Sequence, residues 1–269
     1  MTDFEENAGE EQESNTWADA PRAFRTSNEP LAAPWEAIFG PLRRGVADDL
    51  VIIGQIGQSL DGKIATESGN SHYINASAGL MHLHRLRALV DAVVVGVGTA
   101  ISDDPLLTVR RVSGPNPVRV VIDPRGRLPR DAKLLADDGT RRLIVTTKSV
   151  KIDTPAGVEI VAIEATDGRI APAAIATALA SRGLHRILIE GGAKTVSGFI
   201  EARCLDRLHI VIAPIILGSG RSGINLPVIQ HVTEALRPPV HSFPLNDEIL
   251  FDCDLSAYRD PIGNAKKSM

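Results

Sequence analysis

The chain has 269 residues, of which 43% are hydrophobic and 23% charged, and its formal net charge is −4. This composition is typical of a globular protein with a sizeable core, and the acidic balance excludes the broad basic surface of a nucleic-acid binder. No apolar run reaches the roughly 18 residues that a membrane span needs, and the acidic start lacks a secretory signal. Two distant cysteines, Cys204 and Cys253, exclude a disulfide framework and a structural zinc site. We therefore expect a cytoplasmic protein.

The beginning of the chain differs in charge from the rest. Residues 1–30 hold eight acidic and two basic residues, a net charge of −6, and show no apolar periodicity. Because like charges repel and little apolar surface is available for burial, residues 1–34 are predicted to form an acidic, disordered tail. Residues 35–50 are expected to dock on the surface as an arm. The folded domain is expected over residues 51–260, followed by a C-terminal tail over residues 261–269.

Hydrophobic patterning predicts alternating strands and helices over the folded domain. Short apolar runs rich in β-branched residues predict strands at 50–57, 91–98, 118–123, 141–147, 157–163, 185–192, 206–218 and 248–259. Helical stripes with capping, proline or glycine signals are found at 75–90, 171–183 and 192–204. The last two strands have no clear helix between them. We therefore predict an α/β fold, a mixed and mostly parallel sheet flanked by helices with an antiparallel C-terminal edge.

Glycine-rich turns follow two of the predicted strands. Residues 190–195 (EGGAKT) open a helix, where glycine lets a backbone approach a phosphate and the helix start offers free N–H groups. A tight strand–helix turn is the alternative, since the segment is not a P-loop. Residues 96–99 (GVGT) resemble the start of a dinucleotide-binding fingerprint without its third glycine. Because ligands bind at the carboxyl ends of parallel strands, the two turns together favour a nucleotide-cofactor site.

Two arginines and a pair of carboxylates are further candidates for ligand binding. Arg87 lies on the helix predicted at 75–90, and Arg110 follows a polar turn. Arginine binds phosphate through paired hydrogen bonds, although a solvated surface side chain is the alternative for each. Asp103 and Asp104 are also typical of a helix end before proline, and further ligands for a metal are not evident near them. The sequence lacks the zinc-deaminase signature and the G-x-S-x-G motif of serine hydrolases. No metal is expected.

Several stretches, taken in order, resemble the reductase domain of the bifunctional riboflavin-biosynthesis deaminase/reductase family, whose fold resembles dihydrofolate reductase. The matching stretches are QSLDGKIA with GNSHYI (58–74), HRLRALVDAVVVGVGTAISDDPLLTVR (84–110), PVRVVID (117–123), ILIEGGAKTVSGFI (187–200) and DRLHIVIAPIILGSG (206–220). The resemblance covers nearly the whole folded domain, from about Val51 to Tyr258. The deaminase half has no counterpart, in agreement with the missing zinc signature, so the chain is similar to a stand-alone reductase.

The resemblance implies which residues contact the substrate and which contact the cofactor. The implied substrate contacts are Ser71, Arg87, Leu107, Arg110 and Glu190. The implied cofactor contacts are Gly57, Tyr73, Thr99, Asp103, Gly192, Ala193, Lys194, Thr195, Val196, Ser197 and Gly198. Arg87 and Arg110 would anchor a phosphate remote from the reacting carbon. Glu190 is the catalytic candidate, which would orient the substrate and relay a proton.

The implied reaction resembles that of 5-amino-6-(5-phosphoribosylamino)uracil reductase, in which NADPH gives hydride to C1′ of the ribose. The cofactor carries the chemistry, so the protein would position the two carbons and exclude water. Lys148 and Arg125 are candidates for the cofactor's 2′-phosphate. Gln55 departs from the family pattern, because many members carry lysine there. The alternatives are an NADPH-dependent reductase of another pyrimidine or pteridine, and a non-catalytic nucleotide-binding relative.

The expected partner is a small phosphorylated molecule rather than a nucleic acid or a membrane. Relatives suggest a homodimer. The apolar run at 208–217 could supply an interface or form a buried core strand.

Overall fold

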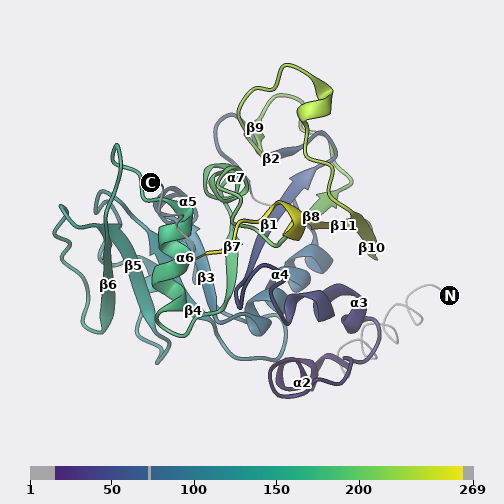
Figure 1. The fold of residues 1–269 in the computed structure, drawn as a ribbon, viewed down its shortest axis with the longest axis horizontal. Helices are drawn as coiled ribbons and strands as arrows, with labels where there is room; N and C mark the ends of the chain where they lie inside the picture. Colours follow the sequence, from purple (N-terminus) through teal and green to yellow (C-terminus); the bar gives the residue numbers. More distant parts are fainter. Residues whose placement is uncertain (1–15, 72–73, 263–269) are drawn as a thin grey trace, which may run out of the picture.

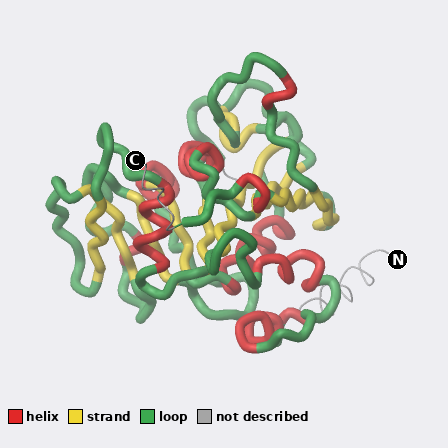
Figure 2. Tube along the Cα trace, viewed as in Figure 1, coloured by secondary structure: helices red, strands yellow, loops and turns green. Residues whose placement is uncertain are grey.

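The computed structural model describes residues 16–71 and 74–262 (Figures 1 and 2). Within these ranges the chain builds one nine-stranded sheet and one two-stranded sheet. The strands of the large sheet, in spatial order, are β10 (Val240–Leu245), β11 (Glu248–Asp254), β8 (Arg207–Ala213), β1 (Val51–Ser59), β7 (Arg186–Glu190), β3 (Ala92–Gly96), β4 (Val118–Ile122), β5 (Arg142–Thr147) and β6 (Val158–Ile163).

Seven of the strands in this described sheet are parallel to one another, from β8 through β6, whereas β11 runs antiparallel to β8 and β10 antiparallel to β11. The predicted α/β class with an antiparallel C-terminal edge is therefore confirmed. The pattern missed β10, because most of its side chains are exposed and it contains Pro244, which is tolerated only at a sheet edge. β8 ends at Ala213, before Pro214, and lies between β11 and β1, so it is a core strand.

Each face of the sheet is covered by a separate apolar core. One face carries α4 (Ser77–Leu89), and its core includes Ile53 and Leu188. The other face packs against α6 (Pro172–Ala180) and α7 (Ala193–Glu201), and α6 crosses the front of the sheet in Figure 1. Successive residues of a strand point to opposite faces, so the continuously apolar strands of the sequence fill both cores, as expected for a parallel sheet.

The N-terminal segment differs from the prediction. Residues 16–34 are not a disordered tail, because α2 (Ala20–Thr26) forms there and Trp17 is buried. Residues 35–50 are not a surface arm either, because Trp35 and Phe39 are also buried. The rings of Trp17 and Trp35 meet edge to face with centroids 5.3 Å apart. A few large aromatic side chains bury enough area to order an acidic segment that lacks periodicity. Residues 1–15 lie outside the described residues, as do residues 263–269 of the predicted C-terminal tail.

A small lobe above the sheet (Figure 1) holds the two-stranded sheet of β2 (Lys63–Ala65) and β9 (Arg221–Ser222). Asp61 ties its two halves together: the carboxylate accepts hydrogen bonds from Ser59 Oγ at 2.6 Å and from the backbone N–H groups of Leu217 and Gly218 at 3.1 and 2.7 Å. These hydrogen bonds lower the pKa of Asp61 to about 2.

Short helical turns complete the described structure. They are α3 (Trp35–Phe39), α5 (Val97–Asp103), η1 (Gly40–Leu42), η2 (Lys133–Leu135), η3 (Val232–Glu234) and η4 (Ser256–Tyr258). The strand predicted at 248–259 thus ends at Asp254 and continues as η4. Among the described helices, none has both the length and the apolar character required to span a bilayer.

Candidate active site at the carboxyl ends of the central strands

Three neighbouring parallel strands bring the predicted site residues to one edge of the sheet. β7 lies between β1 and β3, and Gln55 on β1 is the register partner of Glu190 on β7. Register partners on parallel strands present their side chains to the same face, which here is the face covered by α4. Gly96 ends β3 at the same edge. The two predicted glycine turns are therefore adjacent in space.

Glu190 forms a two-pronged ion pair with Arg87 of α4. Arg87 donates from Nε to Glu190 Oε2 at 2.8 Å and from Nη2 to Oε1 at 2.5 Å. It also donates from Nη1 to the carbonyl oxygen of Thr108 at 3.0 Å. The two residues are only 5% and 8% exposed. Parallel charge-assisted hydrogen bonds of this kind fix both position and orientation, so Arg87 holds the Glu190 carboxylate in place at the end of β7.

This pairing limits the phosphate-binding role expected for Arg87, since three of its N–H groups are already used within the chain. Arg110 is different. Its side chain is exposed, and Nη1 donates to Thr108 Oγ1 at 2.8 Å. Its backbone N–H donates to Nδ1 of buried His84 at 2.9 Å. The structure thus brings both arginines to the segment around Thr108, but only Arg110 presents its guanidinium to solvent.

His84 is a site residue that the sequence reasoning missed. Burial, followed by the charges of Arg87, Arg110 and Arg111, lowers the pKa of His84 to about 3. The imidazole is therefore neutral near pH 7, and its Nδ1 is free to accept the hydrogen bond from the Arg110 backbone. The signal in the sequence is that His84 lies three residues before Arg87 on the same helix, which places both side chains on one face.

The turn that leads to Arg110 is strained. Asp104 ends α5 with φ 40° and Leu107 follows with φ 56°, both in the left-handed region that non-glycine residues rarely adopt. Such conformations cost on the order of 1–3 kcal/mol each and persist only where the surroundings hold them. The Leu107 side chain is buried in the α4-side core. A substrate contact of Leu107, as the resemblance implies it, would therefore have to be made through its backbone.

The two glycine turns interlock through a pair of threonines. A Cβ on Gly192 would lie 2.5 Å from Thr99 Oγ1, and a Cβ on Gly96 would lie 2.5 Å from Thr195 Oγ1. Gly191 and Gly192 also have positive φ values of 68° and 58°. Each turn therefore needs glycine to admit a threonine from the other. Thr99, implied as a cofactor contact, lies directly against the glycines. It belongs to α5, a short helix that the sequence reasoning did not predict.

The start of α7 offers unpaired backbone donors. Among the described residues, the N–H groups of Ala193 and Lys194 make no hydrogen bond, whereas the N–H of Thr195 donates to the Gly192 carbonyl at 3.0 Å. Free N–H groups at the start of a nine-residue helix, preceded by glycines with positive φ, fit the pyrophosphate of a dinucleotide. Two later residues among the implied cofactor contacts face inward. Val196 lies in the core, and Ser197 Oγ accepts a hydrogen bond from Asn225 N at 2.8 Å.

The remaining predicted residues differ in exposure and in their contacts. Asp103 is exposed and accepts from Ser102 Oγ at 2.6 Å. Lys148, just after β5, pairs with Glu164 at 2.6 Å. A Cβ on Gly198 would meet open space. Ser71 is half-buried, Arg125 is exposed, and Tyr73 lies outside the described residues.

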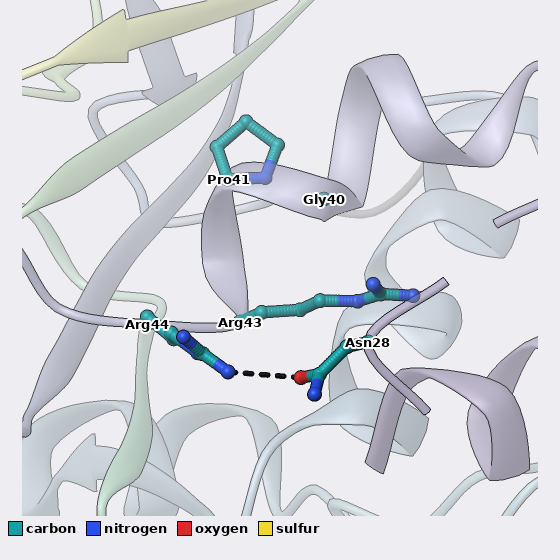
Figure 3. Close-up of a pocket in the computed structure, with 5 residues that line it drawn as sticks. All are labelled: Asn28, Gly40, Pro41, Arg43 and Arg44. Carbon is teal, nitrogen blue, oxygen red and sulfur yellow. Dashed lines mark hydrogen bonds between the residues drawn. The ribbon is translucent and has the colours of Figure 1, made fainter. Parts of the chain in front are cut away.

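A separate pocket lies in the N-terminal segment and shares no residue with this edge. It is lined by Asn28, Gly40, Pro41, Arg43 and Arg44. Figure 3 shows Arg44 reaching Asn28, to whose Oδ1 it donates at 2.8 Å. In the described ranges, no cluster of three or more His, Cys, Asp or Glu residues is arranged to hold a metal ion.

The RibD C-terminal domain family is matched over residues 51–237, which is most of the chain. The chain belongs to this family. It is 36% identical over 175 residues to the 2,5-diamino-6-ribosylamino-4(3H)-pyrimidinone 5′-phosphate reductase of Archaeoglobus fulgidus, which covers 61% of this chain and 80% of that protein. It is 31% identical to the protein of the same name from Methanothermobacter thermautotrophicus, over 75% of this chain and 96% of that protein.

A solved structure agrees with the family. The deaminase/5-amino-6-(5-phosphoribosylamino)uracil reductase of Thermotoga maritima superposes with a TM-score of 0.66 at 26% identity, over 82% of this chain and 59% of that one. The chain spans about half the length of several RibD relatives that it matches. The dihydrofolate-reductase-like fold and the resemblance to a stand-alone reductase are both confirmed. The two archaeal relatives are named as reductases, and the RibD relatives as riboflavin biosynthesis proteins.

Proposed function

We propose that this protein is an NADPH-dependent reductase that transfers hydride to C1′ of the ribose in a phosphoribosylaminopyrimidine, a step of riboflavin biosynthesis. The observation that carries the proposal is the fixed Glu190 carboxylate beside two interlocked glycine turns at one edge of the sheet. An edge of this kind is where ligands bind in parallel sheets. The names of the two archaeal relatives support the substrate class.

The cofactor half of the site would be formed by the turns and the start of α7. The free N–H groups of Ala193 and Lys194 would hold the pyrophosphate. Thr99 and Gly57 would line the adjoining stretch, and reduced nicotinamide supplies the hydride when bound. Preference for NADPH would come from Lys148 or Arg125, since a cation near the adenosine ribose favours the 2′-phosphate. Lys148 would then exchange its ion pair with Glu164 for the phosphate.

The substrate half would be divided between anchoring and orientation. Arg110, exposed and held through its backbone by His84, would anchor the phosphate. Arg87 would act through Glu190, which it holds in one orientation, and Ser71 would contribute a hydroxyl. Glu190 would orient the pyrimidine-bearing amine and relay to its nitrogen the proton that is gained when the open-chain imine is reduced. Because the chemistry is a hydride transfer, correct placement of the two carbons supplies much of the rate.

The test is oxidation of NADPH with the phosphorylated diaminopyrimidinone and with its deaminated uracil form, each against a no-substrate control. We expect turnover with one of them and formation of the ribityl product. In Arg110→Ala, KM for the phosphorylated substrate should rise at least tenfold while the fold is kept, because a charge-assisted contact is lost. The exposed neighbour gives a matched control, Arg111→Ala, with an expected KM near wild type. Absence of turnover with every substrate rejects the reductase, whereas an unchanged KM in Arg110→Ala rejects only the anchor.

A reductase of another pyrimidine or a pteridine is the second candidate, and Gln55 favours it. This side chain is buried and is the register partner of Glu190, so a neutral carboxamide stands where many family members place a charged amine. Turnover of a pteridine, with none of either phosphorylated pyrimidine, would establish this candidate. NADPH binding without turnover of any substrate would instead indicate a non-catalytic relative. A homodimer stays a prediction, which sedimentation at equilibrium would test.

A further inference from the structure

The start of α4 is fixed by a carboxylate from a strand distant in sequence. Glu248, the first residue of β11, is buried and accepts hydrogen bonds from Asn75 Nδ2 at 2.7 Å, Ala76 N at 3.0 Å and Gly79 N at 2.7 Å. A Cβ on Gly79 would lie 2.6 Å from Glu248 Oε2, so glycine leaves room for this contact. Backbone N–H groups at a helix start lack intrahelical partners and favour negative charge. Glu248 therefore clamps the beginning of α4.

The same carboxylate sets the orientation of the Asn75 amide. The backbone N–H groups of Ala76 and Gly79 donate to the two oxygens of Glu248, so both oxygens act as acceptors and the NH₂ of Asn75 faces them. The amide oxygen Oδ1 is then directed to Gly57, where a Cβ would lie only 1.8 Å from it. Within the described ranges, no hydrogen bond engages Oδ1, and the Asn75 side chain is half-buried. A fixed acceptor is thus left unused beside the backbone of β1.

This acceptor lies at the candidate active site. Gly57 is two residues beyond Gln55 on β1, and alternate residues of a strand present the same face. Gln55 is the register partner of Glu190, so Asn75 approaches the carboxyl end of β1 on the face that carries the catalytic candidate. The amide of Asn75 comes from the chain segment that precedes α4. Its Nδ2 donates to Glu248 at 2.7 Å and, over a longer distance of 3.4 Å, to the Val211 carbonyl of β8, so Glu248 is its nearer anchor.

We propose that Asn75 is a ligand-binding residue whose Oδ1 accepts a hydrogen bond from a neutral N–H group, and that Glu248 is its positioning residue. The inference rests on the proposed function, in which two ligands carry such a group next to the reacting carbons: the carboxamide of nicotinamide and an amino group of the pyrimidine. A buried polar group held in place rejects analogues that lack the matching N–H, because the group is then left unpaired.

Two pairs of ligands distinguish the sources. In the cofactor arm, fluorescence titration compares Kd for NADPH with Kd for its 3-acetylpyridine analogue, which lacks the N–H. In the substrate arm, kcat/KM is compared between the amino-pyrimidine and an analogue without that amine. Wild type should prefer the N–H ligand by about tenfold in one arm, the value of one hydrogen bond. Asn75→Ala should lose that preference, whereas Ser77→Ala, an exposed position on the same helix start, should keep it.

Glu248→Gln tests the positioning role. Its amide NH₂ would face donors, so Asn75 would no longer be fixed and the preference should shrink, with a lower Tm. A variant that lowers Tm yet keeps the full preference would show that Glu248 only stabilises the helix. Asn75→Ser replaces Asn75→Ala if the latter fails to fold. Equal preference in wild type and Asn75 variants in both arms overturns the inference alone. The titration needs no turnover, so this outcome is separate from failure of the proposed reductase.

Discussion

Two buried arginine–carboxylate pairs lie on the face of the sheet that carries α4, and they differ in where they sit on the sheet. Arg87 and Glu190 meet at the carboxyl end of β7. Arg207 and Asp252 meet between β8 and β11, where Arg207 Nε donates to Asp252 Oδ1 at 2.9 Å and Nη2 donates to Oδ2. Each pair uses the same parallel hydrogen bonds. Their local chemistry therefore does not explain why one is proposed as a catalytic element and the other is not.

A polar row connects the two pairs across the sheet. Four residues on neighbouring strands are aligned by register: Asp252 with His209, His209 with Gln55, and Gln55 with Glu190. All are buried on the face under α4. Near the Asp252 end of the row, His209 is covered by His82, whose Nε2 lies 3.0 Å from His209 Nδ1.

The two ends of the row differ in the course of the backbone beyond the carboxylate. At the Glu190 end of the row, β7 stops at Glu190 itself and its backbone turns away through Gly191 and Gly192. Around Asp252 the sheet continues beyond the row toward the same edge, because β8 extends from His209 to Ala213 and is paired there with the first residues of antiparallel β11. A ligand can approach a carboxylate only where the strands end, so position on the sheet determines which pair is available for chemistry.

The largest expected effect is on stability, at the pair of Arg207 and Asp252. Arg207→Met should lower the free energy of unfolding by about 3–5 kcal/mol, because the buried Asp252 charge would lose its arginine and keep the His209 ring, 3.3 Å away, as a weaker partner. Urea unfolding at pH 7 measures this, and kcat/KM per folded molecule should stay close to wild type. A large loss of kcat with unchanged stability would contradict the assignment of this pair to the core.

At the pair of Arg87 and Glu190 the expected loss is in activity. Glu190→Gln keeps the size and one acceptor oxygen toward Arg87 but removes the group that relays the proton, so kcat should fall at least about 100-fold, in the range of general acid–base effects. The free energy of unfolding should change by less than the change in Arg207→Met. Wild-type kcat in Glu190→Gln would remove Glu190 from the mechanism and leave it as the partner that orders Arg87.

The same contrast explains what the sequence could predict. Glu190 and both glycine turns follow apolar strands, so a local pattern places them at strand ends before any contact is known. The pairing of Arg87 with Glu190 joins residues 103 positions apart and leaves no local trace. Trp17 and Phe24 were missed for a related reason, since they order an acidic segment by packing on the α4-side core rather than by periodicity.

The smallest expected effect concerns His84 of α4. The pKa of His84 is about 3, below its usual value of 6.5, so between these values the unfolded chain binds a proton that the folded protein does not. Stability should therefore fall as pH decreases below 6.5, by up to about 1.4 kcal/mol per pH unit from this group. His84→Asn removes the titration and keeps an acceptor near the Nδ1 position for the Arg110 backbone.

The His84→Asn variant should show a shallower decline of unfolding free energy between pH 6.5 and 5, with KM for the phosphorylated substrate near wild type. Asp206 titrates in the opposite sense, since burial raises its pKa to about 6 and a protonated folded form gains stability as pH falls. Because Asp206 is present in both proteins, its contribution cancels when the unfolding free energy of the variant is subtracted from that of wild type. His84→Leu, which removes the acceptor, should also flatten the profile but raise KM, because the Arg110 backbone would lose its partner. Equal KM values in the two variants would show that His84 does not position Arg110.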